Sequence, residues 1–301
     1  MTVIGSRGSD LALWQARHVR DLLAECAGLA ADIRVIQTAG DRLQDAQLTT
    51  LEGKGFFTKE IEEALLGGEI DLAVHSHKDL PTQAPLGLVV AAVPQRGPVE
   101  ECLVARPQAW DDAAPGVPLR EGALVGTGSP RRASQLLALR SDLRTADLRG
   151  NVPTRVGKVA QGRYDAILLA RAGLVRLGLE VAPLRLHVFD PDVFVPAPAQ
   201  GALAVQLRAE ESRRAGDEAL AQAVARIHHL PSARAVAAER LLLAALEGGC
   251  NLPLGAHAVV LGDGIRLTAT LGLPGGGVRR CVVEADDPAS AARAARRALT
   301  A

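Results

Sequence analysis

The feature that most constrains the fold is the alternation of short apolar strands with amphipathic helices over the first two thirds of the chain. Thr2–Gly5 is predicted to be a strand, and apolar residues recur with helical spacing after Ser9, which suits an N-cap. The pattern restarts at residues 123–127, where Ser129 and Pro130 make a strong helix start. Alternating strands and helices favour largely parallel sheets covered by helices. The sequence therefore predicts an α/β architecture.

Two proline-containing stretches, 94–98 and 191–198, interrupt this alternation and are predicted to be crossings between two lobes. The chain is then expected to leave lobe one, build lobe two and return. The last third differs, because a predicted helix at 232–246 precedes three short strands and a closing helix at 288–299. Glycine-containing turns separate those strands, so we expect a small α+β domain with antiparallel strands.

Composition excludes several classes of protein. Lys and Arg total 34, as do Asp and Glu, so the basic excess of a dedicated nucleic-acid binder is missing. No apolar run approaches the roughly 18 residues that span a bilayer, and no secretory signal is expected from the first ten residues. The four cysteines are far apart, which argues against a zinc ribbon or a disulfide scaffold and favours free thiols in a reducing cytoplasm.

Basic side chains follow nearly every predicted strand of the α/β region. Ligands bind beyond the carboxyl ends of strands in such sheets, and arginine holds a carboxylate through two hydrogen bonds. Any one of these residues is more simply explained as a solvated surface group. Together they favour a site for a ligand with several carboxylates or phosphates. The set is Arg7, Lys78, Arg131, Arg132, Arg149 and Arg155.

Asp79 is the one carboxylate among these cations, directly after Lys78. It could bind N–H donors or a cationic group, or move protons, although an ordinary turn aspartate is the simpler interpretation. His75 and His77 lack a third ligand, so no metal site is predicted. The segment 53–55 lacks the spacing of a phosphate loop, and a glycine-containing lid is expected there instead of nucleotide binding.

Cys250 is the only cysteine placed like a functional thiol. It follows two glycines after a predicted helix, in a loop before Pro253, where a thiol is more exposed and more reactive. Cys26 and Cys281, in a predicted helix and a predicted strand, are expected to be small apolar fillers. No His or Asn is evidently placed to make Cys250 a protease-type nucleophile.

Seven segments together closely resemble the hydroxymethylbilane synthase family, also called porphobilinogen deaminase. They occur in the family's order and span nearly the whole chain. Ala199 stands where many relatives have Gly, and the C-terminus is short, but neither departure touches the chemistry. The segments are 6–16 (SRGSDLALWQA), 53–60 (GKGFFTKE), 75–81 (HSHKDLP), 126–132 (GTGSPRR), 148–155 (LRGNVPTR), 200–202 (QGA) and 246–253 (LEGGCNLP).

The resemblance implies an organisation and an activity. The lobes would be similar to those of periplasmic binding proteins, at residues 1–95 with 193–212 and at 96–192, and a C-terminal domain at 213–301 would hold the cofactor. Four porphobilinogen molecules would be deaminated and condensed head to tail onto a covalent dipyrromethane primer. Hydrolysis would then release hydroxymethylbilane for haem and other tetrapyrroles. The family suggests a cytoplasmic monomer, with no nucleic-acid or membrane partner.

Site roles carry over by residue-wise match to the family. Cys250 would bear the dipyrromethane through a thioether, and Asp79 would stabilise the cation left when ammonia departs and relay protons. Each porphobilinogen has two carboxylates, and the arginines at the strand ends would bind them. The cofactor-binding residues would be Lys78, Asp79, Thr127, Ser129, Arg131, Arg132, Arg149 and Arg155. Substrate would meet Arg7, Ser9, Arg149, Arg155, Arg176 and Gln200, and the lid would carry Lys54, Phe57 and Lys59.

Two other functions fit part of the pattern. A non-catalytic binding protein of the periplasmic type would use the same lobes and arginines for a polyanion, but the absent signal and the Cys250 loop argue against it. A cysteine acyltransferase with Cys250 as nucleophile is weakened by the lack of a base partner. The mass of the intact protein separates these three possibilities.

Overall fold

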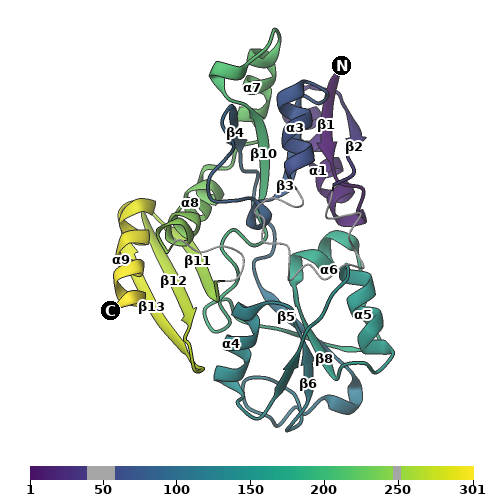
Figure 1. Ribbon diagram of the computed structural model, residues 1–301, viewed down its shortest axis with the longest axis vertical. Helices are drawn as coiled ribbons and strands as arrows, with labels where there is room; N and C mark the ends of the chain where they lie inside the picture. The colour runs from purple at the N-terminus through teal and green to yellow at the C-terminus, as the bar shows by residue number, and fades with distance from the viewer. Residues whose placement is uncertain (39–57, 247–251) are drawn as a thin grey trace. The chain divides into compact units, whose positions relative to one another are not determined.

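The computed structural model describes residues 1–38, 58–246 and 252–301. The predicted lid residues Lys54 and Phe57, and the predicted attachment residue Cys250, lie outside the described residues. The chain divides into two compact units, residues 1–97 with 201–234 and residues 98–200 with 235–301 (Figure 1). The bounds of the three domains expected from the sequence stay a prediction.

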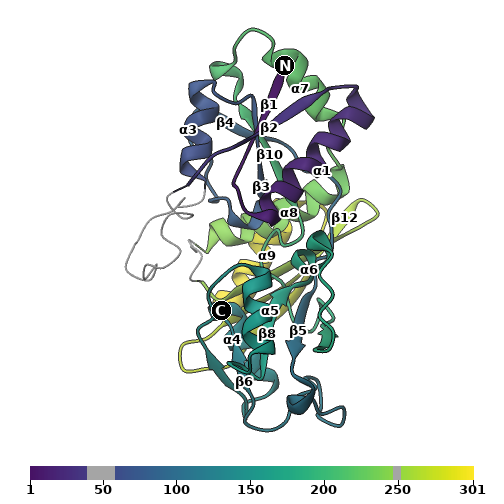
Figure 2. The same ribbon diagram turned by 90° about the vertical axis from the view of Figure 1, so that its right-hand side faces the viewer.

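The first unit is built around a five-stranded sheet with helices on both faces (Figure 2). Four strands run in one direction and β10 runs antiparallel between β3 and β4. The strands, in spatial order, are β2 (Ala31–Val35), β1 (Thr2–Ser6), β3 (Leu72–Ser76), β10 (Leu203–Arg208) and β4 (Leu88–Ala92). The helices are α1 (Asp10–Ala27), α3 (Lys59–Gly67) and α7 (Asp217–Ala225).

Apolar stripes on these helices account for their places. Val19 and Leu23 of α1 are fully buried against Ile4 and its neighbours on one face of the sheet. Ile61 and Leu65 of α3 pack on the other face. Burying each such side chain contributes about 1.5–3 kcal/mol. Helix α1 begins as predicted, because the Ser9 hydroxyl accepts a hydrogen bond from the Ala12 N–H at 3.3 Å.

The second unit contains a sheet with the same strand order. Four strands again run in one direction, and β5 runs antiparallel between β8 and β9. The strands, in spatial order, are β7 (Arg144–Ala146), β6 (Leu124–Gly126), β8 (Ala166–Ala170), β5 (Glu101–Ala105) and β9 (Arg185–Val188). The helices beside it are α4 (Pro130–Leu139), α5 (Val152–Ala160) and α6 (Arg171–Leu177).

The same unit holds a three-stranded antiparallel sheet near the C-terminus, as predicted. Its apolar face packs against α9, with Leu267 and Leu299 buried in one cluster. The strands are β11 (Leu254–Leu261), β12 (Gly264–Gly272) and β13 (Val278–Ala285), and the closing helix is α9 (Pro288–Thr300). Helix α8 (Leu230–Ala245) begins in the first unit and continues into the second at Ala235. The α/β class, the mainly parallel lobe sheets and the small α+β region are therefore confirmed.

Some elements escaped the sequence analysis, and one placement was wrong. The antiparallel strands β5 and β10 were not predicted, although both are buried along their whole length. Cys26, expected as an apolar filler, is exposed near the end of α1, whereas Cys281 is partly buried. Helical periodicity placed Cys26 in α1 without fixing which face it occupies. Within the described residues, no helix is long and apolar enough to cross a membrane.

Candidate functional site

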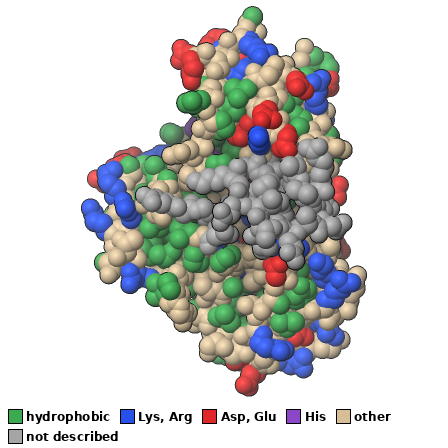
Figure 3. Space-filling view, in the orientation of Figure 1, with side chains coloured by type: hydrophobic (Ala, Val, Ile, Leu, Met, Phe, Trp, Pro, Cys, Tyr) green, Lys and Arg blue, Asp and Glu red, His purple; other side chains and the backbone are tan. Residues whose placement is uncertain are grey.

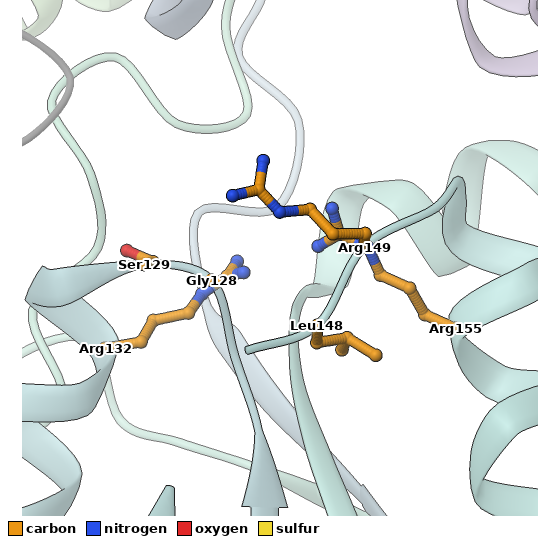
Figure 4. Close-up of a pocket in the computed structure, with 6 residues that line it drawn as sticks. All are labelled: Gly128, Ser129, Arg132, Leu148, Arg149 and Arg155. Atoms are coloured by element: carbon orange, nitrogen blue, oxygen red, sulfur yellow. The ribbon is translucent and has the colours of Figure 1, made fainter. Parts of the chain in front are cut away.

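A pocket of about 200 Å³ lies at the carboxyl ends of β6 and β7 in the second unit. Three arginines reach it from different places: the first turn of α4, the loop after β7, and the first turn of α5 (Figure 4). The face drawn in Figure 3 carries both basic and acidic side chains. The pocket is lined by Gly128, Ser129, Arg132, Leu148, Arg149 and Arg155.

Two glycines and a helix cap shape this pocket. A Cβ on Gly128 would lie 3.2 Å from the Leu148 carbonyl oxygen, so glycine lets the two lining loops approach closely. Gly150 has a φ of +115°, which side chains rarely adopt. Asn151 then caps α5 by accepting a hydrogen bond from the Thr154 N–H at 2.9 Å. This turn orients Arg155, whose Nε donates to the Gly150 carbonyl at 2.7 Å.

The electrostatics of the pocket favour an anionic ligand. Burial lowers the pKa of Arg155, and repulsion from Arg132 and Arg149 lowers it further, while Asp147 offsets only part. Like charges raise one another's free energy when water is partly excluded, and an incoming anion relieves that cost. Arg132 already binds Glu101 and the Leu168 carbonyl, whereas the forked guanidinium groups of Arg149 and Arg155 beside it suit a ligand with several carboxylates.

A buried carboxylate supports the pocket from below. Glu101, the first residue of β5, is fully buried and forms ion pairs with Arg131 and Arg132 of α4. The Arg132–Glu101 distance is 2.7 Å. A buried charge without a partner costs several kcal/mol, so this triad holds α4 firmly against β5. The sequence analysis missed Glu101; an acidic residue directly before the apolar run 102–105 was the only available signal.

Arg131 is engaged inside the unit and is not one of the residues that line the pocket. Arg131 Nη1 donates a hydrogen bond to the Val195 carbonyl at 2.9 Å. Burial lowers the pKa of Arg131, and the nearby charge of Glu101 offsets part of that effect. Gln135, one turn later on α4, also donates to that carbonyl and accepts from the Val195 N–H. Arg131 therefore fixes the returning crossing segment to α4.

Three other predicted site residues of the second unit, Thr127, Gln200 and Arg176, are buried. The Thr127 hydroxyl accepts a hydrogen bond from the Ser129 N–H at 3.2 Å, which shapes the turn into α4. Gln200 is fully buried and donates to the Val99 carbonyl at 2.9 Å. Arg176 is 9% exposed in the last turn of α6. None of these three lines the pocket.

The first unit holds the remaining predicted residues at its strand ends. Arg7 directly follows β1, and Ser9 caps α1. Lys78 and Asp79 lie in η2 (His77–Asp79), the turn that follows β3, and Asp79 is exposed there. Lys59, expected in the lid, is the first residue of α3 and lies 3.8 Å from the carboxylate of Glu63. The substrate, cofactor and catalytic roles of all these residues stay predictions.

Polar contacts on both faces of β3 hold the turn that carries Asp79. On one side the Gln15 amide of α1 donates to the Ser76 hydroxyl at 2.8 Å. Toward the other helix layer, Gln206 of β10 lies 3.2 Å from His75 Nε2 and donates to Glu62 of α3 at 3.0 Å. Burial lowers the pKa of His75 to about 4, so the imidazole is neutral at pH 7. These contacts anchor the end of β3, the strand that leads into the turn carrying Asp79.

The fold and the pocket define a class: an α/β protein with an arginine-lined pocket at the ends of its strands. Family models agree, matching "porphobilinogen deaminase, dipyromethane cofactor binding domain" over residues 2–215 and "porphobilinogen deaminase, C-terminal domain" over residues 233–296. The chain belongs to the porphobilinogen deaminase family. The predicted family and the predicted enzyme class are confirmed.

Curated relatives extend this agreement. The porphobilinogen deaminase of Nitratidesulfovibrio vulgaris (Miyazaki F) is 46% identical over 263 residues, which cover 87% of this chain and 79% of the relative. That of Rubrobacter xylanophilus is 47% identical over 280 residues, covering 91% and 85%. Among solved structures, the BvgS periplasmic VFT2 domain of Bordetella pertussis is 15% identical to this chain, with a TM-score of 0.40. The match covers 75% of this chain and 86% of the BvgS chain. That likeness is too distant to carry an argument.

Proposed function

We propose that this chain is a hydroxymethylbilane synthase that joins four porphobilinogen molecules on a dipyrromethane carried by Cys250, and then releases the product by hydrolysis. The observation that carries the proposal is the cluster of Arg132, Arg149 and Arg155 around one pocket in a member of this family. Burial, with repulsion from Arg132 and Arg149, lowers the pKa of Arg155, and the acetate and propionate groups of porphobilinogen and dipyrromethane would offset that repulsion.

The pocket residues fit a dipyrromethane by their chemistry. Arg132, Arg149 and Arg155 would hold its carboxylates, and the Ser129 hydroxyl, which makes no cap hydrogen bond to α4, adds a donor. When bound, the cofactor supplies the pyrrole to which the next unit is joined. Arg131, held by Glu101 and Val195, would act through the position of α4.

Asp79 would act on the substrate. Loss of ammonia from porphobilinogen leaves a cation, and an ionised carboxylate beside the pyrrole N–H stabilises that charge and can accept or return a proton. The hydrogen-bonded support of η2, through Ser76 and His75, would hold the carboxylate in place with little reorganisation. The substrate would also be bound by Arg7, Ser9, Arg176 and Gln200. The enzyme would be a cytoplasmic monomer.

Intact-protein mass spectrometry tests the proposal. The purified chain should be heavier than its sequence by one dipyrromethane, and Cys250→Ser should abolish that excess. Cys26→Ser is the matched control because Cys26 is an exposed thiol, and this variant should keep the excess mass. A wild-type mass equal to the sequence mass, with no consumption of porphobilinogen, would favour the binding protein. A mass gained only with an acyl donor would favour the acyltransferase.

A further inference from the structure

One acidic residue borders the pocket, and the family comparison assigns it nothing. Asp147 follows β7 directly and lies two residues before Arg149. Its Oδ2 accepts a hydrogen bond from Arg149 Nε at 3.0 Å. Both side chains are exposed, at 50% for Arg149 and 60% for Asp147. An exposed ion pair contributes little to stability, so the pair calls for another explanation than holding the fold.

Contacts on its backbone and side chain fix Asp147 in place. The Tyr164 hydroxyl donates to the Asp147 carbonyl oxygen at 2.6 Å. A Cβ on Gly128 would lie 2.9 Å from Asp147 Oδ1, so the carboxylate rests against the glycine of the opposite lining loop. The Asp147 side chain is therefore exposed to solvent on one side and in contact with the opposite lining loop on the other.

This placement decides which edge of the Arg149 guanidinium faces the pocket. With Nε bound to Asp147, the two terminal nitrogens of Arg149 have no hydrogen-bond partner within the described residues. Those two nitrogens form the end of the fork that binds a carboxylate through parallel hydrogen bonds. Without Asp147, repulsion from Arg132 and Arg155 would push the long, flexible side chain outward.

We propose that Asp147 is a positioning residue that presents the end of the Arg149 fork to a carboxylate of the ligand. The inference rests on the proposed function for the identity of that ligand, porphobilinogen or the chain growing from it. It acts through hydrogen-bond geometry: an acceptor at Arg149 Nε orients the group, and the negative charge of Asp147 is secondary. An amide oxygen at the same place can therefore substitute.

Steady-state kinetics of three variants test this role. Asp147→Ala should raise KM for porphobilinogen about fivefold, the effect of an interaction near the upper limit for exposed pairs, while kcat changes less than about twofold. Asp147→Asn should restore KM to within about twofold of wild type, because its Oδ still accepts from Nε. Asp21→Ala, which breaks the comparably exposed Arg20–Asp21 pair, is the matched control and should change nothing. An unchanged KM in Asp147→Ala, or equal defects in the Ala and Asn variants, would overturn the proposal.

A readout independent of turnover uses the arginine Nε–H signals in NMR spectra of the full chain. The Arg149 signal is assigned by its loss in Arg149→Lys. Its hydrogen exchange should be slow in the wild type and in Asp147→Asn, and several-fold faster in Asp147→Ala; equal exchange in all three contradicts the inference. If the wild type does not consume porphobilinogen, the proposed function fails, and the exchange comparison still decides whether Asp147 orients Arg149.

Discussion

The two α/β sheets share one strand order and differ in what their antiparallel strand buries. In the first sheet that strand is β10, which comes after the second sheet in the chain; in the second it is β5, which comes before the rest of its own sheet. Strand β10 carries Gln206, which bridges Glu62 and neutral His75. Strand β5 carries Glu101, which binds two guanidinium groups.

The positions of these polar residues along the strands explain the difference. Glu101 is paired with Ala170, the last residue of β8, so its charge lies at the carboxyl end of the sheet, beside the pocket. Gln206 is paired with Ala73, near the start of β3, in the interior of the first sheet. The shared topology fixes where strands end. The side chains on the antiparallel strand, β10 or β5, decide whether the carboxyl end of the sheet carries a buried charge.

The largest expected effect comes from removing the buried charge of the second sheet. Glu101→Gln leaves two buried guanidinium groups with a neutral partner and should lower the free energy of unfolding by about 3–5 kcal/mol. Gln206→Leu, the corresponding change in the Glu62–Gln206–His75 network, should cost about 1–3 kcal/mol because hydrogen-bonding groups lose a partner. Urea unfolding of both variants measures the contrast. Equal losses would show that the two networks do not differ as described.

A somewhat smaller effect should appear as a pH dependence from the first sheet. His75 has a pKa of about 4 in the folded chain and 6.5 as its ordinary value, so the unfolded chain binds more protons between these limits. Stability from His75 is therefore complete above pH 6.5 and is lost as the pH falls toward 4, by at most about 3 kcal/mol. Glu62 acts in the opposite direction, since burial raises its pKa and acidification relieves the cost of its charge.

The variant His75→Gln separates these two contributions. It removes the imidazole but keeps a side chain that can donate to Gln206 Oε1. The free energy of unfolding, measured in urea between pH 4.5 and 7, should fall less on acidification in this variant than in the wild type. The same pH dependence in both proteins would remove His75 as its source.

Much of the fold was predictable from local patterns. The strand at Thr2–Gly5, the N-cap Ser9 and the helix start at Pro130 are set by residues within a few positions of each other, and the structure has all three. Strands β5 and β10 were missed because their place in a sheet depends on partners far along the chain. In β10, Gln206 also puts a polar group inside the strand, which breaks the apolar pattern typical of a buried strand.

The candidate site was predictable in part. Residues at strand ends pointed to Arg132, Arg149 and Arg155, and the structure brings these three together. Arg131 came with them in the sequence, and both Arg131 and Arg132 bind Glu101, but Arg131 also binds the Val195 carbonyl and does not line the pocket. Asp147 gave no signal in the sequence, since its meaning depends on Gly128 and Tyr164 lying against it in space. The role of Asp79 stays a prediction.

The smallest expected effect compares the serines that open α1 and α4, the helices after the corresponding strands β1 and β6. The Ser9 hydroxyl caps its helix, whereas the Ser129 hydroxyl makes no cap hydrogen bond and lines the pocket. Ser9→Ala should therefore lower the free energy of unfolding by about 1 kcal/mol, and Ser129→Ala by less than about 0.5 kcal/mol. Urea unfolding at pH 7 measures both, and the pair is matched in residue type and in place. An equal loss would mean that Ser129 also serves the helix, and its hydroxyl would then be less available to a ligand.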